Sequence, residues 1–170
     1  MQKFNFVTDG SVVYRLGGNE WYAVVENNYK VLLVDTDCKV GNEELSVPWL
    51  NNDWQSEDGQ SILDYCNSIA DTYFGTIKWA IMPRIFDTGV KKSESVCMWP
   101  MPCDEFIKNN IVCKKVIKNS SGYVWLRTLR DIGSDIFYIA PAFYLKKSAI
   151  NQITEDGEIV LKLVNVDITN

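Results

Sequence analysis

Residues 3–36 carry the feature that most constrains the fold, a series of short β-type runs separated by tight-turn residues. The breaks lie at residues 9–10 (Asp-Gly), 17–19 (Gly-Gly-Asn) and 27–28 (Asn-Asn), and Gly and Asn readily supply the positive φ angles of tight hairpin turns. The pattern predicts an antiparallel meander, and the apolar run Val31–Val34 predicts a strand covered on both faces. The expected strands are Lys3–Val7, Ser11–Leu16, Glu20–Glu26 and Lys30–Asp35.

A long helix is predicted after a polar, turn-rich segment. Ser61 and Asp64 form a start that resembles a capping box, apolar residues then keep helical spacing, and Gly75 stands where a helix C-cap is expected. A helix with one broad apolar face is expected to pack on a sheet. A second, short helix is predicted over residues 103–110, because Pro102 suits the first helical position.

The order of the predicted elements indicates an α+β fold with mainly antiparallel pairing, one long helix and one short helix. The length of 170 residues is enough for one well-cored domain, so residues 1–170 are predicted to form a single domain. The later strands are expected at Lys78–Phe86, Ser95–Met101, Cys113–Lys118, Tyr123–Thr128, Ile136–Lys146 and Glu158–Ile168.

Charge and hydropathy limit the partners to expect. The net charge is −5 and the sequence pI about 4.8, so the overall field repels phosphate backbones and no nucleic-acid partner is predicted. The sequence has no long apolar stretch and no apolar segment of the signal-peptide type at its start. We therefore expect no membrane partner and a cytoplasmic or virion-associated protein.

Cysteine and histidine usage limits the chemistry to expect. The five cysteines have spacings that fit no zinc ribbon, and the chain has no His, so buried free thiols are predicted and no metal or cofactor is expected. The absence of His also excludes a Ser-His or Cys-His hydrolase. A carboxylate pair for glycoside hydrolysis stays an alternative, because the fold sets the separation of such groups.

Two segments near the end of the chain resemble a family of bacterial and phage modules of unassigned function. Members of that family end in a W-L-R-[ST] strand, a loop and a V-R-P-A-[FL]-x-[IL] strand, which correspond to residues 125–128 (Trp-Leu-Arg-Thr) and 139–145 here. Residues 46–51 are similar to the family's S-x-[IL]-x-x-W-L-N segment. The resemblance covers approximately residues 20–150. Ala140 stands where the family pattern has Arg, so the polar contacts of that Arg would have to come from Arg127 or Arg84.

The resemblance implies a fold and a mode of action. The family's ending is in turn similar to that of C-type-lectin-like folds, which present loops to a ligand on phage tails and bacterial surface proteins. It therefore implies a C-type-lectin-like fold and a phage or prophage origin. Phage fibre tips are commonly trimers, so a homo-oligomer is a further expectation, although the sequence shows no coiled-coil heptads.

The loop between the two closing β-segments is the first candidate site. Residues 129–135 include Arg130, Asp131, Ser134 and Asp135, a mixed-charge tip on a predicted β scaffold, where binding modules usually place recognition residues. A solvated hairpin tip without function is the alternative interpretation.

A second candidate is Trp99 with Met101, whose flanking prolines would stiffen an exposed binding hot spot. Core burial is the alternative for Trp99. Arg127 beside Trp125 is interpreted as a structural peg that stacks on an aromatic ring, and Pro141 is interpreted as the mark of an edge strand.

These features favour a non-enzymatic module that binds a protein or glycan through surface loops. An alternative from another class is a small acidic phage inhibitor that occupies the basic groove of a host defence enzyme. The third alternative is the hydrolase with a carboxylate pair.

Overall fold

The computed structural model describes residues 4–35, 39–40, 43–44, 46–48, 57–86, 94–101, 136–138 and 140–163. Its helices are α1 (Glu57–Phe74) and the 3-10 segments η1 (Gly75–Ala80) and η2 (Lys147–Ala149). Its strands are β1 (Tyr14–Leu16), β2 (Asn19–Glu26), β3 (Lys30–Val34), β4 (Lys39–Val40), β5 (Glu43–Glu44), β6 (Ser46–Pro48), β7 (Ile81–Met82), β8 (Arg84–Phe86), β9 (Glu94–Val96), β10 (Trp99–Pro100), β11 (Ile136–Tyr138), β12 (Pro141–Lys146), β13 (Ile150–Ile153) and β14 (Ile159–Leu161).

The main sheet has the strand order β1-β2-β3-β12-β10, and β7 also pairs with β12. All of these pairings are antiparallel. The predicted meander is confirmed for β1, β2 and β3, and Gly17 and Gly18 form the two-residue turn between the first two strands at φ angles of 62° and 82°. The predicted α+β class with mainly antiparallel pairing is thus confirmed.

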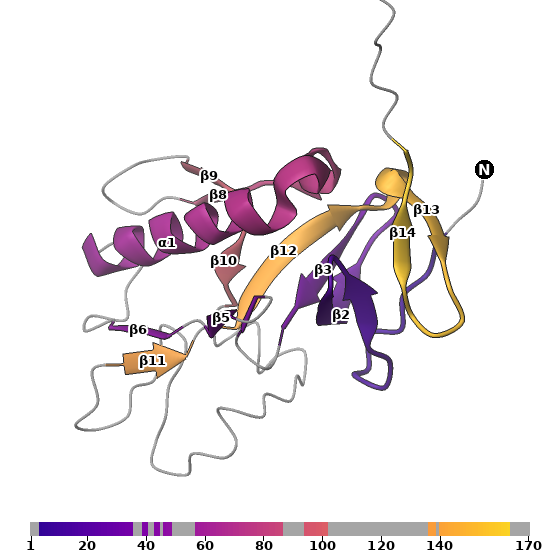
Figure 1. The fold of residues 1–170 in the computed structure, drawn as a ribbon, viewed down its shortest axis with the longest axis horizontal. Coiled ribbons are helices and arrows are strands. Elements are labelled where there is room, and N and C mark those ends of the chain that lie inside the picture. Colours follow the sequence, from indigo (N-terminus) through magenta and orange to yellow (C-terminus); the bar gives the residue numbers. More distant parts are fainter. Residues whose placement is uncertain are drawn as a thin grey trace, which may run out of the picture.

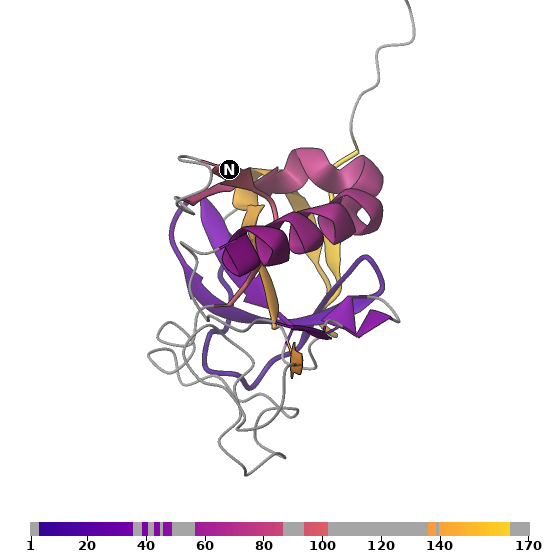
Figure 2. The ribbon, with the colours of Figure 1, turned by 90° about the vertical axis from the view of Figure 1, so that its left-hand side faces the viewer.

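Helix α1 lies across one face of the main sheet, and a turned view shows the strands beneath it (Figure 1, Figure 2). The aromatic core lies between these two layers. The Phe143 ring is 4.7 Å from the ring of Trp21 and 4.7 Å from that of Phe74, both in edge-on geometry. Each such pair contributes about 1 kcal/mol beyond the burial of its surface. These rings therefore join α1 to β2 and β12.

Strand β3 is buried along its apolar length. Residues Val31–Val34 are all at most 2% exposed, as predicted for a strand covered on both faces. The strand pairs with β2 on one side and β12 on the other, which leaves its backbone no free edge. Such a strand provides a rigid base for the segments at its ends.

The β13–β14 hairpin (Figure 1) is a separate two-stranded sheet, and one isolated parallel bridge between Arg15 and Glu158 joins it to β1. The Arg15 backbone N–H donates to the Gly157 carbonyl at 2.9 Å, and Gly157 has a φ of 92°. Arg15 also pairs with Asp156 at 2.7 Å, but both side chains are well exposed, so this pair contributes little to stability. The backbone contact at Gly157 is the stronger tie.

Several predicted boundaries were wrong. Helix α1 begins at Glu57 instead of Ser61, and no strand forms over residues 4–7. The predicted strand Lys78–Phe86 consists of the end of η1, then β7 and then β8. Pro83 separates the two strands, because proline lacks the backbone N–H that strand pairing needs. The predicted strand Ile136–Lys146 is split into β11, which pairs with β6, and β12 in the main sheet.

The interpretation of Pro141 as an edge-strand residue was also wrong. Pro141 opens β12, which has β3 on one side and β10 on the other. Proline fits there because it is the first residue of the strand, and its carbonyl still accepts a hydrogen bond from the Asp35 backbone N–H at 3.0 Å.

Candidate functional site

The first candidate loop lies outside the described residues. This holds for Arg130, Asp131, Ser134 and Asp135, and also for the predicted pegs Trp125 and Arg127. The predicted short helix over residues 103–110 and the predicted strands Cys113–Lys118 and Tyr123–Thr128 lie outside it as well.

Trp99 and Met101 are completely buried, so the prediction of an exposed hot spot was wrong and the core alternative for Trp99 is confirmed. Trp99 pairs in register with Ala142, whose small side chain leaves room for the indole. The Trp99 ring lies 5.1 Å from the Tyr144 ring, and the Arg84 guanidinium carbon lies 5.4 Å from its centre. Ala140, where the family pattern has Arg, is buried too.

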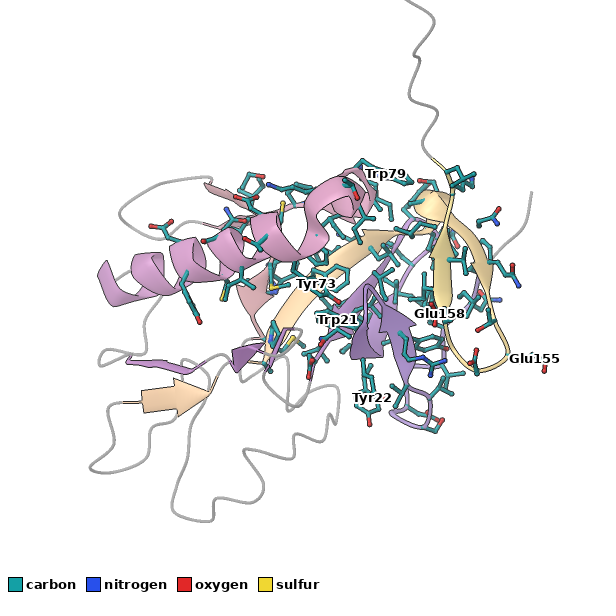
Figure 3. All side chains as sticks on the ribbon, viewed as in Figure 1. Trp21, Tyr22, Tyr73, Trp79, Glu155 and Glu158 are labelled. Carbon is teal, nitrogen blue, oxygen red and sulfur yellow. The ribbon has the colours of Figure 1, made fainter. Side chains whose placement is uncertain are left out.

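A buried polar cluster lies between the turn after β1 and helix α1. The Asn19 side-chain amide donates to Asp35 at 2.5 Å, and both residues are 3% exposed. The Tyr73 hydroxyl donates to the Leu16 carbonyl at 2.6 Å, and Trp21 and Tyr73 point toward each other while Tyr22 points away from α1 (Figure 3). Burial raises the pKa of Tyr73, so its hydroxyl stays neutral and serves as a structural donor.

Cys66 and Cys97 are the cysteines that the described residues include, and both are free. Cys66 is buried, as predicted, and burial raises the pKa of its thiol, which keeps it neutral and unreactive. Cys97 is only half-buried, and burial raises the pKa of its thiol too. Neither thiol has the lowered pKa of a nucleophile.

An open cleft of about 650 Å³ lies at the end of the main sheet where β3 begins and β12 ends. Segments that are far apart in the chain form its walls. The lining residues are Phe4 and Asn5 near the N-terminus, Asn28 and Tyr29 in the β2–β3 turn, Met82 in β7, Lys146, Lys147 and Ser148 around η2, Ile150 and Asn151 in β13, and Lys162 after β14.

Hydrogen bonds hold these walls together. The Lys147 backbone N–H donates to the Tyr29 carbonyl at 2.8 Å, and that of Lys162 donates to the Ala149 carbonyl at 2.8 Å. The Asn27 side chain accepts from the backbone N–H groups of Tyr29 and Lys30 at 2.8 Å and 3.0 Å, which fixes the turn that carries Tyr29. Tyr29 is nevertheless 74% exposed. The cleft thus presents an aromatic side chain from a fixed backbone.

The cleft is basic although the protein is acidic. Lys147 forms an ion pair with Glu26, and these side chains are only 12% and 21% exposed. The Lys146 ammonium donates to the Trp79 carbonyl at 3.0 Å. Among the described residues, no Asp or Glu lines the cleft and none forms an ion pair with Lys146 or Lys162, whereas the whole chain has 22 acidic residues. The field in the cleft therefore attracts anions.

Comparison of the chain with protein-family models, curated proteins and solved structures found no match.

The described part of the chain lacks two other structural features. No helix there is both long enough and apolar enough to cross a bilayer. No group of three or more His, Cys, Asp or Glu side chains there is placed to hold a metal ion.

Sequence reasoning missed the cleft because its residues come from five separate segments. One local signal was present in the adjacent pair Lys146 and Lys147, at the end of an aromatic strand. The turn residues Asn27 and Asn28 beside Tyr29 were the second signal, since loops on a rigid scaffold often carry binding residues.

Proposed function

We propose that the protein is a non-enzymatic binding module that recognises a protein or glycan ligand, and that the cleft beside Tyr29 is the recognition surface. The cleft carries the proposal, because it is concave, has apolar walls and contains a few convergent polar groups. Backbone hydrogen bonds join its walls to one another, so a ligand meets a largely preformed surface.

The absence of acidic groups from the described lining supports binding over hydrolysis. A glycoside hydrolase, the third alternative from the sequence, needs two carboxylates that flank the bond to be cleaved. The described lining residues include no Asp or Glu, and Lys147 is engaged by Glu26. The predicted phage or prophage origin and the C-type-lectin-like assignment belong to the same proposal, and the antiparallel sheet with one long covering helix is compatible with them.

The exposed Tyr29 provides the test of this proposal. We expect purified protein to be retained by a defined subset of probes on arrays of synthetic peptides and of glycans. Replacing Tyr29 by alanine is expected to weaken that retention about tenfold or more, because exposed aromatic anchors commonly provide the largest share of binding energy.

Ile85 provides a matched control, because it is 61% exposed and lies outside the cleft. The Ile85→Ala variant should retain the same probes as the wild type. Retention that is unchanged by Tyr29→Ala, or no retention on either array, would contradict the proposal.

The acidic inhibitor is the second candidate, and the β13–β14 hairpin is the observation in its favour. Glu155, Asp156 and Glu158 are exposed, and Figure 3 shows Glu155 and Glu158 on this hairpin. Binding of the protein to a basic nucleic-acid-binding enzyme that persists in the Tyr29→Ala variant would favour this candidate over the cleft.

A further inference from the structure

The chemistry of the cleft selects among possible ligands. Lys146 and Lys162 each offer a ligand an ammonium group, whereas that of Lys147 is paired with Glu26, and an ammonium is a hydrogen-bond donor and never an acceptor. A ligand that complements them must offer acceptors, and a carboxylate offers acceptors only. Sugar hydroxyls need acceptors as well as donors, and carboxylate acceptors are absent from the described lining.

The remaining lining residues add two further requirements. Phe4, Met82 and Ile150 form apolar surface together with the Tyr29 ring. Such surface favours aliphatic or aromatic groups on the ligand. The side-chain amides of Asn residues in the same lining offer a donor and an acceptor each, which matches the N–H and C=O groups of a peptide backbone.

From this combination we infer that the cleft binds an acidic peptide segment of a partner protein, in which Glu or Asp side chains alternate with apolar ones. The inference rests on the proposed function and chooses a protein over a glycan within it. Lys146 and Lys162 meet the carboxylates of the segment, while Glu26 holds Lys147 in place at the wall. The segment's apolar side chains pack on Tyr29 and Ile150.

Charge provides a reason for selectivity as well as affinity. The chain as a whole carries a net charge of −5, which repels acidic polymers at long range. Only a short acidic segment that reaches the lysine-lined end of the sheet gains from the local positive field. A long polyanion such as nucleic acid would extend beyond the cleft onto the acidic remainder of the protein.

A pair of synthetic hexapeptides tests the inference. One is acetyl-Glu-Leu-Glu-Phe-Glu-Leu-amide, and the other has Gln in place of every Glu, so that the two have the same shape and differ in charge. We expect fluorescence anisotropy to show binding of the acidic peptide at least about tenfold tighter than that of its Gln counterpart at low salt. NaCl added to about 300 mM should lower the affinity for the acidic peptide several-fold, because salt screens exposed charges.

Lys162 and Lys78 provide a matched pair of variants. Both side chains are exposed, and only Lys162 lines the cleft. Lys162→Gln should lower the affinity for the acidic peptide about fivefold. Lys78→Gln makes the same change of charge and should leave that affinity unchanged. An equal loss in both variants, or equal affinity for the Glu and Gln peptides, would overturn the inference.

Other probes separate this inference from the proposed function. Two anionic probes of other classes are a tetramer of galacturonic acid and a short oligothymidine. If either binds more tightly than the acidic peptide, and its binding is lost in Lys162→Gln, the cleft is an anion site of another class and the peptide assignment is overturned. Binding of a neutral glycan by the wild type would overturn the inference if Tyr29→Ala abolished that binding and Lys162→Gln left it unchanged. The proposed function would then still stand. Failure of every probe would overturn both.

Discussion

Replacing Phe143 by alanine should lower the free energy of unfolding by about 3–5 kcal/mol. Phe143 has no exposed surface and lies 4.7 Å, between ring centres, from both Trp21 and Phe74. Removal of its ring leaves a cavity between α1 and the main sheet, and the buried rings of Trp21 in β2 and Phe74 in α1 lose their contacts with it. Urea denaturation followed by circular dichroism measures the effect.

Tyr29→Ala is the control for this prediction, since it also removes an aromatic ring, but from a side chain that is 74% exposed. Its unfolding free energy should stay within about 0.5 kcal/mol of the wild type. This result would also show that the binding test with Tyr29→Ala uses a folded protein. A loss below about 1 kcal/mol in Phe143→Ala would mean that the ring is not central to the core.

Replacing Gly157 by alanine should destabilise the contact between the β13–β14 hairpin and β1, at a cost of about 3 kcal/mol or more. A methyl group at Gly157 would lie 2.4 Å from the Val13 carbonyl oxygen, and the φ of 92° is strained for any residue with a side chain. The positive φ alone costs about 1–2 kcal/mol, and the clash with a backbone atom adds to it because backbone cannot move aside as a side chain does.

Gly10 separates the two contributions. Its φ is 82°, and nothing lies within 4 Å of the position that a Cβ would take. Gly10→Ala should therefore cost only about 1–2 kcal/mol. Hydrogen exchange provides the second readout, because the Arg15 amide donates to the Gly157 carbonyl at 2.9 Å and should lose protection in Gly157→Ala alone. Equal costs in the two variants would contradict the close approach at Gly157.

Local signals were enough to predict the meander of β1, β2 and β3. Gly17 and Gly18 have the positive φ angles that their turn requires, and the apolar run of β3 is buried as expected. Local signals failed where a segment's structure depends on its neighbours. The apolar residues of η1 resemble the start of a strand in sequence, but Gly75 has a φ of 46° and the chain continues from α1 as a 3-10 turn.

Long-range packing explains the other differences. The sequence left Trp99 open between a binding hot spot and the core, and its pairing with Ala142 in the main sheet decides for the core. The cleft itself unites Asn5, Tyr29 and Lys162 from distant parts of the chain. A single sequence predicts such a site poorly, because the site depends on which strand ends meet at one edge of the sheet.

Mapping of the acidic peptide on the protein by nuclear magnetic resonance tests the central claim most directly. During titration of labelled protein, we expect the largest amide shifts at Asn28, Tyr29, Ser148 and Asn151, which line the cleft, and none at Ile85. Shifts confined to residues 129–135, or to the exposed side of α1, would contradict the claim that the lysine-lined cleft is the recognition surface.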